Sequence, residues 1–595
     1  MQKILNYPIE VLRGFLYNIC VCAQSLCALY VLLRRNMMKK VLSLLLTLVM
    51  IVSCMALSAC DGLKLSANKD AEPAKELPVH VSDDKYRNYY HIWVCAFEDS
   101  NGDETGDLQG IINRLDYIND GNPETTEDLG MDAIWLSPIM PSDSYHKYDV
   151  DDYMDIDPAF GDLETFDRLM EECNKRGIAV ILDLVLNHCG TGHELWINAL
   201  SQAREGNFSE DARYYRFTEN AGVAGTGWRS VVGNPGLWYE GQFSPEMPEW
   251  NLEFEGTRDY FEEVAKFWLD RGVAGFRLDA VMYMTDETTS GTEFLNWFYT
   301  TAQKYNPDVY MVGENWQGNS EIYDTYESGI DSQFAFSFAT GSGFFANSTV
   351  TSKGQYLANQ LLKFHTNSKE ANENAINAFF LSNHDMVRSG NFFAKGLSDK
   401  KMAAAAYLLT PGNSFTYYGE EIGMEVPENC FNNDAFYRGA MNWDEKNPNP
   451  IWCTADAYSD CPYGGVEQQT DDADSLLSFY RDAIRVKNQS PQIARGDITE
   501  VISFENGADI CAFKVEYEGE IIIVIHNMDD ENSATLTLTE DMVKDPVIRG
   551  KLYAKTQTDR EKLGAEAEDK IVETSLADMI LKMPAQSTVV LGSAK

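Results

Sequence analysis

The sequence predicts an α/β fold: a (β/α)8 TIM barrel with an inserted subdomain after strand 3 and a C-terminal all-β domain. Three observations predict it. From residue 86 to about residue 490 of the 595, short apolar runs alternate with amphipathic helical stretches. Residues 189–252, rich in Gly, Trp and Tyr, interrupt this alternation as an inserted subdomain does. Beyond residue 490 only turns separate the apolar runs, which is typical of an all-β domain.

Eight short apolar runs are the expected barrel strands, and most are separated by helical patterns such as 165–176 and 257–271. The runs are 91–97, 133–136, 179–184, 275–278, 310–313, 332–336, 378–381 and 414–417. In such a barrel the active site lies at the C-terminal ends of the strands. The residues directly after each run are therefore the candidates for chemistry.

These patterns divide the chain into six segments. They are a signal or leader segment (1–59), a lipid-anchored linker (60–85), the first part of the barrel (86–188), the inserted domain B (189–252), the second part of the barrel (253–490) and a C-terminal β-sandwich (491–595).

The composition excludes some classes of function. With 48 Lys and Arg against 92 Asp and Glu, the formal charge is −44, and such a surface repels nucleic acid. The same charge favours a soluble monomer. The 30 Tyr, 29 Phe and 11 Trp can fill a large core, and some can instead stack on the apolar faces of sugar rings.

The N-terminal segment has the pattern of an export signal. Met37-Met38-Lys39-Lys40 precedes a long apolar run that ends in Leu57-Ser58-Ala59-Cys60, which resembles a bacterial lipobox. We expect cleavage before Cys60, lipid on its thiol, and a protein anchored to the bacterial membrane at the cell surface, outside the cytoplasm. The alternative is a transmembrane helix within residues 1–59.

Seven cysteines follow Cys60, and none forms a CxxC pair, so a zinc site is not indicated. Cys430, Cys453 and Cys461 lie close together in the sequence. A disulfide among these three is expected outside the cell, although the sequence does not give its connectivity.

Ionisable side chains follow several of the expected strands. His188 follows the third run, Asp279 the fourth, Glu314 the fifth, and His384 with Asp385 the seventh. A single carboxylate of this kind is usually a solvated or capping group. Four strand ends in order indicate a catalytic site.

At these positions the sequence resembles the α-amylase family of glycoside hydrolases, family 13, from about residue 86 to the C-terminus. The resemblance implies that Asp279 is the nucleophile, Glu314 the general acid/base and Asp385 a third carboxylate that binds sugar hydroxyls. It also implies that Arg277 orients the nucleophile and that His188 and His384 bind the sugar at subsite −1. The charge of Arg277 should hold Asp279 ionised.

Two further segments extend the resemblance. Residues 144–150 are similar to the family's segment after strand 2, which implies that Tyr148 stacks on the −1 sugar, supported by Asp149 with His146 nearby. Residues 248–252 occupy the place of a fifth family region, but Glu249 and Trp250 stand where Asp is usual.

Residues 99–107 carry oxygen ligands at alternating positions, which suits calcium. The loop is not an EF-hand, because Glu104 stands at the sixth position, where that motif requires Gly. It resembles a calcium loop of oligosaccharide-cleaving family members, and this implies the ligands Asp99, Asn101, Asp103, the Thr105 carbonyl and Asp107. The alternative is an acidic solvated turn.

The expected function is a retaining hydrolase that cleaves α-1,4-glucosidic bonds of starch-derived glucans or maltooligosaccharides by double displacement. Ala280 after the nucleophile favours α-1,4 links by resemblance, whereas Met282-Tyr283 departs from the Lys-His pair of typical α-amylases. Two alternatives remain. One is an α-glucosidase or glucanotransferase acting on short oligosaccharides, including α-1,6-linked ones. The other is a non-catalytic glycan-binding surface lipoprotein on the same scaffold.

Overall fold

The computed structural model describes residues 84–284, 291–393, 396–444, 459–563, 570–571 and 573–594. The predicted leader, Cys60 and nearly all of the predicted linker lie outside these residues. Among the helices of the described part, none is both long and apolar enough to cross a bilayer.

Eight parallel strands form the barrel, in the order β10-β11-β1-β2-β3-β7-β8-β9. Their bounds are β1 Asn88–Ile92, β2 Ala133–Leu136, β3 Ala179–Leu184, β7 Gly275–Leu278, β8 Tyr310–Gly313, β9 Ser332–Gln333, β10 Ala378–Phe380 and β11 Asn413–Tyr417. A parallel bridge between Phe334 and Ala378 joins the two ends of this order. The predicted barrel is confirmed.

The first strand lies earlier than the sequence predicts. The expected run was 91–97, but β1 ends at Ile92 and residues Val94–Ala96 form a 3-10 helix. These residues are buried although they are not in the sheet. Their apolar character therefore reflects burial at the end of the barrel and not strand structure.

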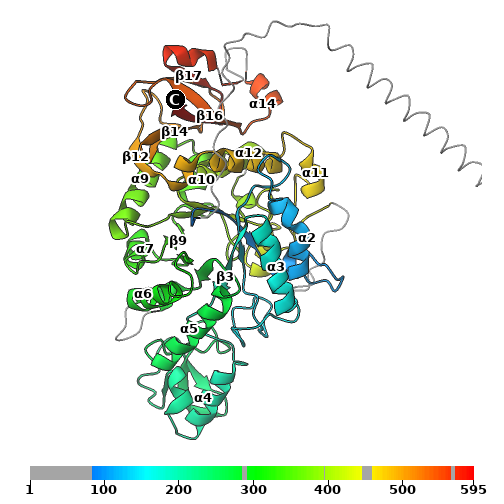
Figure 1. Cartoon of the computed structure of the whole chain (residues 1–595), viewed down its shortest axis with the longest axis vertical. Helices are drawn as coiled ribbons and strands as arrows, with labels where there is room; N and C mark the ends of the chain where they lie inside the picture. The colour runs from blue at the N-terminus through cyan, green and yellow to red at the C-terminus, as the bar shows by residue number, and fades with distance from the viewer. Residues whose placement is uncertain are drawn as a thin grey trace, which may run out of the picture. The chain divides into compact units, whose positions relative to one another are not determined.

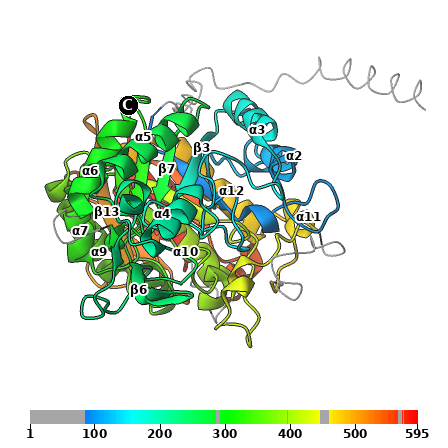
Figure 2. The same cartoon turned by 90° about the horizontal axis from the view of Figure 1, so that it is seen from below.

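Helices surround the sheet (Figures 1 and 2). They are α2 Leu108–Ile118, α3 Leu163–Lys175, α5 Glu255–Leu269, α6 Gly291–Ala302, α7 Asn319–Tyr326, α8 Phe344–Val350, α9 Gly354–Ala371, α10 Leu397–Leu408, α11 Val466–Thr470, α12 Leu476–Asn488 and α13 Pro491–Arg495. Helix α2 illustrates why they form: the Asp107 side chain caps its first turn, and Leu108, Ile111, Leu115 and Ile118 recur at helical spacing on its buried face.

One glycine is required where two strands that lead to the site lie against each other. A Cβ atom at Gly275, the first residue of β7, would lie 1.9 Å from the carbonyl oxygen of Tyr310 on β8. Any larger residue would push β7 and β8 apart, and these strands lead to Asp279 and Glu314.

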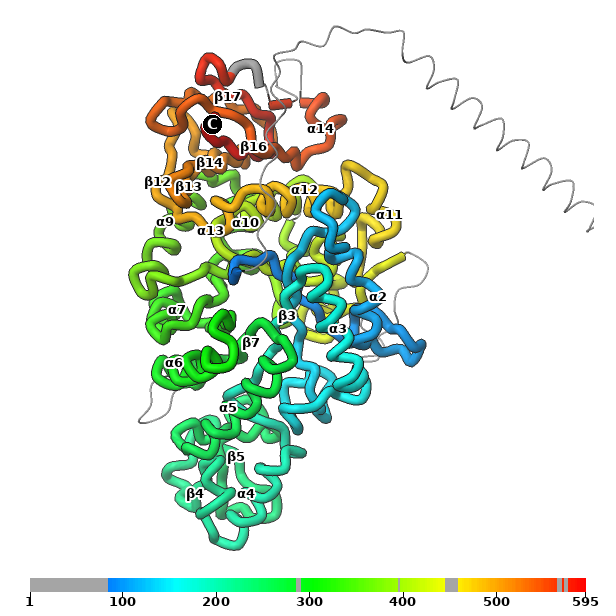
Figure 3. Tube along the Cα trace, viewed as in Figure 1, coloured from blue at the N-terminus to red at the C-terminus, as the bar shows by residue number. Residues whose placement is uncertain are grey.

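The insert between β3 and α5 has a small sheet of its own (Figure 3). It contains α4 Glu194–Arg204 and three antiparallel strands, β4 Phe217–Thr218, β5 Trp228–Val231 and β6 Asn234–Glu240. Trp196 of α4 packs on Phe217 and Tyr239, with ring centroids 5.7 and 4.8 Å apart. A bridge between His188 and Glu249 joins the two ends of the insert at the rim of the barrel.

The C-terminal domain is all-β apart from short helical turns, as predicted. Its five-stranded antiparallel sheet has the order β12-β13-β14-β18-β16, and β15 pairs with β17. The bounds are β12 Asp497–Val501, β13 Ile510–Tyr517, β14 Glu520–Asn527, β15 Ala534–Thr537, β16 Pro546–Tyr553, α14 Gln557–Lys562, β17 Ile580–Met583 and β18 Ser587–Ser593. Side chains from both sheets, such as Ile523 and Leu581, share one core.

The predicted disulfide is wrong. Cys430 and Cys461 are both free, so no disulfide can form within the group of three cysteines. Cys95 is the disulfide-bonded residue, and its partner lies outside the described residues.

Candidate active site

Arg277 is the centre of a buried cluster of charges. It lies on β7 and is fully buried. Its Nη1 donates to Asp183 Oδ1 at 2.6 Å and to Asp279 Oδ1 at 2.7 Å, and its Nη2 forms an ion pair with Glu314 Oε1 at 2.9 Å. Three carboxyl groups from three neighbouring strands therefore surround one guanidinium group.

Burial dominates the titration of this cluster. It raises the pKa of Asp279 well above its usual value; Arg277 opposes the shift, and the neighbouring carboxyls of Glu314 and Asp183 add to it. Burial raises the pKa of Asp183 as well. The expected effect of Arg277 is present but does not outweigh burial. Three carboxyls around one cation favour a shared proton, so the cluster suits one carboxylic acid beside a carboxylate.

Asp385 has a different environment. Its Oδ2 lies 2.9 Å from His384 Nε2, and its Oδ1 accepts from Arg438 Nη2 at 2.9 Å. Although burial opposes the shift, His384 and Arg438 lower the pKa of Asp385 well below its usual range. These partners favour the anionic form of Asp385, whereas burial around Arg277 favours the protonated forms of Asp279 and Asp183.

Tyr148 connects these two groups. Its hydroxyl lies 3.0 Å from Asp183 Oδ2 and 2.7 Å from His384 Nε2, and its ring stacks on His384 with centroids 5.5 Å apart. The structure therefore brings Tyr148, His384 and the carboxyl cluster together.

His146, Asp149 and His188 form a neighbouring group. His146 Nδ1 lies 3.8 Å from Asp149 Oδ1, and Ser142 and Ser144 also donate to this oxygen. Burial lowers the pKa of His188 to about 4, so its ring is neutral. Its Nε2 is buried without a hydrogen-bond partner within the described residues and is therefore free to bind a ligand.

The sequence is similar to those of known proteins. The family model for the α-amylase catalytic domain matches residues 91–496. The chain belongs to the α-amylase family. It is 33% identical over 451 residues to alpha-amylase 3 of Dictyoglomus thermophilum, covering 74% of this chain and 85% of that protein.

Solved structures of the α-amylase family agree with the fold. Eubacterium rectale Amy13B has a TM-score of 0.77 at 35% identity, covering 87% of this chain and 97% of that one. An alpha-amylase from H. orenii has a TM-score of 0.72 at 30% identity, covering 86% and 100%. This family member is an α-amylase-type glycoside hydrolase.

Sequence reasoning missed two residues of this α-amylase family site. Asp183 lies within the apolar run of β3, and a carboxyl group in a buried strand is a signal that a cationic partner exists. Arg438 binds Asp385 and the carbonyl of His384, and its guanidinium lies 4.5 Å from the ring of Trp93. Arg438 ends the 3-10 helix Asp434–Arg438, far from every recognised motif, and no sequence signal points to it.

The loop predicted to bind calcium forms a series of turns. Asp99, Asn101 and Asp103 each accept a hydrogen bond from a backbone amide of the loop, while Asp107 caps α2 and accepts from Ser100. Across the described residues, no three His, Cys, Asp or Glu side chains lie close enough together to hold a metal ion. The donors are hard oxygens of the kind calcium prefers, but their carboxylates are not gathered as ligands here.

The backbone at Glu104 and the burial of Thr105 also bear on the predicted calcium site. Glu104 has a φ of 73°, in the left-handed region that favours Gly, so the Glu at this position strains the turn. Thr105, whose carbonyl was a predicted ligand, is buried.

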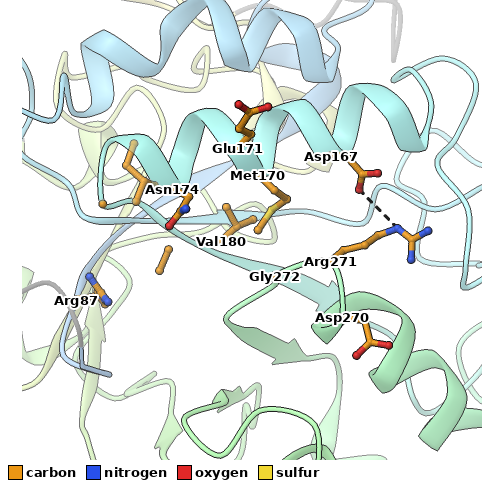
Figure 4. A pocket seen from close by; sticks show the side chains of 12 residues that line it. Arg87, Asp167, Met170, Glu171, Asn174, Val180, Asp270, Arg271 and Gly272 are labelled. Atoms are coloured by element: carbon orange, nitrogen blue, oxygen red, sulfur yellow. Dashed lines mark ion pairs between the residues drawn. The ribbon is translucent and has the colours of Figure 1, made fainter.

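A cavity of about 690 Å³ lies away from this site (Figure 4). Residues 178–180 at the start of β3 and residues 270–272 before β7 line it, and Arg271 forms an ion pair with Asp167 at 3.7 Å. The carboxyls of Asp183 and Asp279 belong to the opposite ends of the same strands. This cavity is therefore not part of the candidate active site.

Proposed function

We propose that the chain is a retaining glycoside hydrolase that cleaves α-1,4-glucosidic bonds of starch-derived glucans or maltooligosaccharides. The observation that carries the proposal is that Arg277 holds the carboxyls of both Asp279 and Glu314. One guanidinium group spans only a short distance. This favours the ~5–5.5 Å carboxyl separation of retaining enzymes over the ~6.5–9.5 Å of inverting ones.

In this reaction Asp279 attacks the anomeric carbon while Glu314 gives its proton to the departing glycosidic oxygen. The bond from the anomeric carbon to that oxygen breaks, and a glycosyl ester with Asp279 forms. Glu314 then takes a proton from water, which attacks the anomeric carbon and releases Asp279. Arg277 supports the oxygen of Asp279 that does not attack.

The remaining residues hold the sugar at subsite −1. Asp385 is kept ionised by His384 and Arg438, so it accepts hydrogen bonds from sugar hydroxyls. Tyr148 provides a ring face, and His188 an unpartnered ring nitrogen. His146 and Asp149 support this group.

The test is sugar release by variants of the two central carboxyls. Asp279→Ala and Glu314→Gln should each abolish release of reducing sugar from maltoheptaose, because one loses the nucleophile and the other the acid. Asp270→Asn, which lines the cavity at the opposite end of the barrel, is the control and should match the parent enzyme. Variant activity within a few-fold of the parent would reject the assignment.

Tyr283 favours a second candidate, an α-glucosidase or glucanotransferase acting on short oligosaccharides. The ring centroids of Tyr283 and Phe243 of the insert lie 5.1 Å apart, and those of Phe243 and His188 also lie 5.1 Å apart. These rings narrow the space beside the −1 residues. Product profiles on starch, maltoheptaose, isomaltose and pullulan distinguish the candidates: a starch hydrolase shortens starch, whereas this alternative acts on the short substrates or lengthens maltoheptaose.

We also propose that residues 99–107 bind calcium, supported by oxygen donors on Asp99, Asn101, Asp103 and Asp107. Asp107 would have to give up its hydrogen bonds to Ser100. Calcium should raise the Tm of EDTA-treated protein, and Asp103→Asn should reduce that increase. An unchanged Tm on adding calcium would leave the loop as an acidic turn.

A further inference from the structure

The two oxygens of the Glu314 carboxyl have different partners. Oε1 accepts from the indole Nε1 of Trp316 at 2.8 Å and lies 2.9 Å from Arg277 Nη2. Oε2 accepts from the backbone N–H of Ala280 at 3.2 Å. One oxygen thus faces a cation and an indole N–H, and the other a single peptide group.

The two partners of Oε1 can only donate. An indole nitrogen and a guanidinium group have no acceptor capacity. A proton on Oε1 would therefore point at a donor or a cation. We propose that Trp316 is a positioning residue that acts with Arg277 to confine the acid proton of Glu314 to Oε2. This proposal rests on the proposed function of Glu314 as general acid.

The indole is held so that its N–H is directed at Glu314. Trp316 is 43% exposed, and its ring lies 4.4 Å from that of Phe336. Phe336 is in turn packed against Phe334 and Phe380 of a buried aromatic cluster. The ring is thus fixed from one side by the barrel core, while part of its surface stays open to solvent.

The backbone N–H of Ala280 is the donor that contacts the other oxygen of Glu314, Oε2. Ala280 follows Asp279 and has a φ of 50°, in the left-handed region, and its N–H points to Oε2. When Oε2 releases its proton to the leaving oxygen, the carboxylate that forms accepts from Trp316, Arg277 and Ala280 together. The donors are therefore already in place for the charge that develops on Glu314.

The decisive experiment compares a substrate that needs acid catalysis with one that does not. Trp316→Phe keeps an aromatic ring beside Phe336 and removes the N–H, together with the five-membered ring that carries it. Its kcat/KM on maltoheptaose should fall about 10- to 100-fold, the range for losing one hydrogen bond to a charged group. On 2,4-dinitrophenyl α-maltoside, whose leaving group departs without a proton, the loss should stay below about threefold.

A pH profile gives an independent readout. Because a donor that stabilises the carboxylate is lost, the alkaline limb of kcat/KM on maltoheptaose should move to higher pH in Trp316→Phe. Phe336→Leu, which loosens the ring but keeps the N–H, should show a weaker form of the same substrate dependence. Trp297→Phe on α6 is the matched control and should equal the parent enzyme.

Equal losses on the two substrates, or an unmoved alkaline limb, would overturn the role of Trp316. Circular dichroism and Tm establish that each variant is folded. If Trp316→Phe does not fold, the losses of Phe336→Leu on the two substrates are compared instead. If the parent enzyme cleaves neither substrate, the proposed function fails instead. The two failures are therefore distinguishable.

Discussion

At the scale of single residues, the site depends on two buried arginines with different tasks. Arg277 is shared by three carboxyls, and burial there favours a retained proton. Arg438, with His384, keeps Asp385 ionised. The same side-chain type therefore lies in two settings: burial outweighs Arg277 and raises the pKa of Asp279, whereas Arg438 and His384 outweigh burial and lower the pKa of Asp385.

Arg438→Gln should weaken the enzyme most at low pH. Arg438 lowers the pKa of Asp385, so its removal raises that pKa and protonates Asp385 at a higher pH than in the parent. We expect kcat/KM on maltoheptaose to fall about 10-fold or more near neutral pH, with a larger loss as the pH falls. Arg438→Lys, which keeps the charge, should recover part of the activity. A loss that is independent of pH would contradict this role.

The sequence predicts the residues that directly follow strands. Asp279, Glu314 and Asp385 could be found in this way because a parallel barrel gathers its strand ends. Arg438 could not, because it reaches Asp385 from a loop 53 residues later that has no periodic pattern. Trp316 lies two residues after Glu314, and its position in the sequence gives no sign of a contact. In the structure it is partly exposed and donates a hydrogen bond to Glu314.

At the scale of elements, apolar runs predict that a strand exists better than they predict its ends. β1 ends at Ile92 and β9 is only two residues long, whereas the expected runs extended to residues 97 and 336. In both places the chain stays buried after it leaves the sheet. An apolar run therefore indicates that a segment is buried, whereas the ends of a strand are set by its backbone hydrogen bonds to neighbouring strands.

The loop after β11 carries a testable pH dependence. Burial raises the pKa of Glu420 to about 7, although hydroxyls of Tyr407, Tyr480 and Ser389 oppose the shift. An unfolded glutamate titrates near ~4.3, so the folded chain binds this proton more tightly. The resulting stability is complete below pH ~4.3 and is lost as the pH rises through about 7.

Glu420→Gln removes this titration. As the pH rises, the free energy of unfolding of the variant should therefore increase relative to that of the parent. The difference in the free energy of unfolding should change by about 3 kcal/mol between pH 4 and pH 8. Urea unfolding at a series of pH values measures it, with Glu516→Gln, an exposed side chain on β13, as the control. A difference that does not vary with pH would show that Glu420 does not retain its proton.

At the scale of the whole molecule, the barrel and the C-terminal all-β domain share polar contacts. Gln586 donates to Asp399 of α10 at 2.6 Å, and His365 of α9 lies 3.1 Å from Asp497 at the start of β12. The sequence predicts the change to β structure near residue 490, close to the observed start at Asp497. The sequence did not indicate that Cys95 is disulfide-bonded, because spacing alone does not give cysteine connectivity.

The predicted lipid anchor can be tested on the full chain. If Cys60 carries lipid, the parent protein partitions with bacterial membranes and Cys60→Ser appears in the soluble fraction. Cys430→Ser, which removes a free thiol elsewhere, is the control. If Cys60→Ser remains with the membranes, the anchor lies in residues 1–59.

The pairing of β1 with β11 also bears on the order in which the barrel is completed during synthesis. β1 pairs with β2, which follows it in the chain, and with β11, whose Ser414 lies roughly 300 residues after its partner Asn88. At ~5–20 residues per second, this interval is on the order of tens of seconds. Asp279 and Glu314 are made within it. A growing chain therefore contains Asp279 and Glu314 before β11, the strand that lies between β10 and β1 in the barrel, has been made.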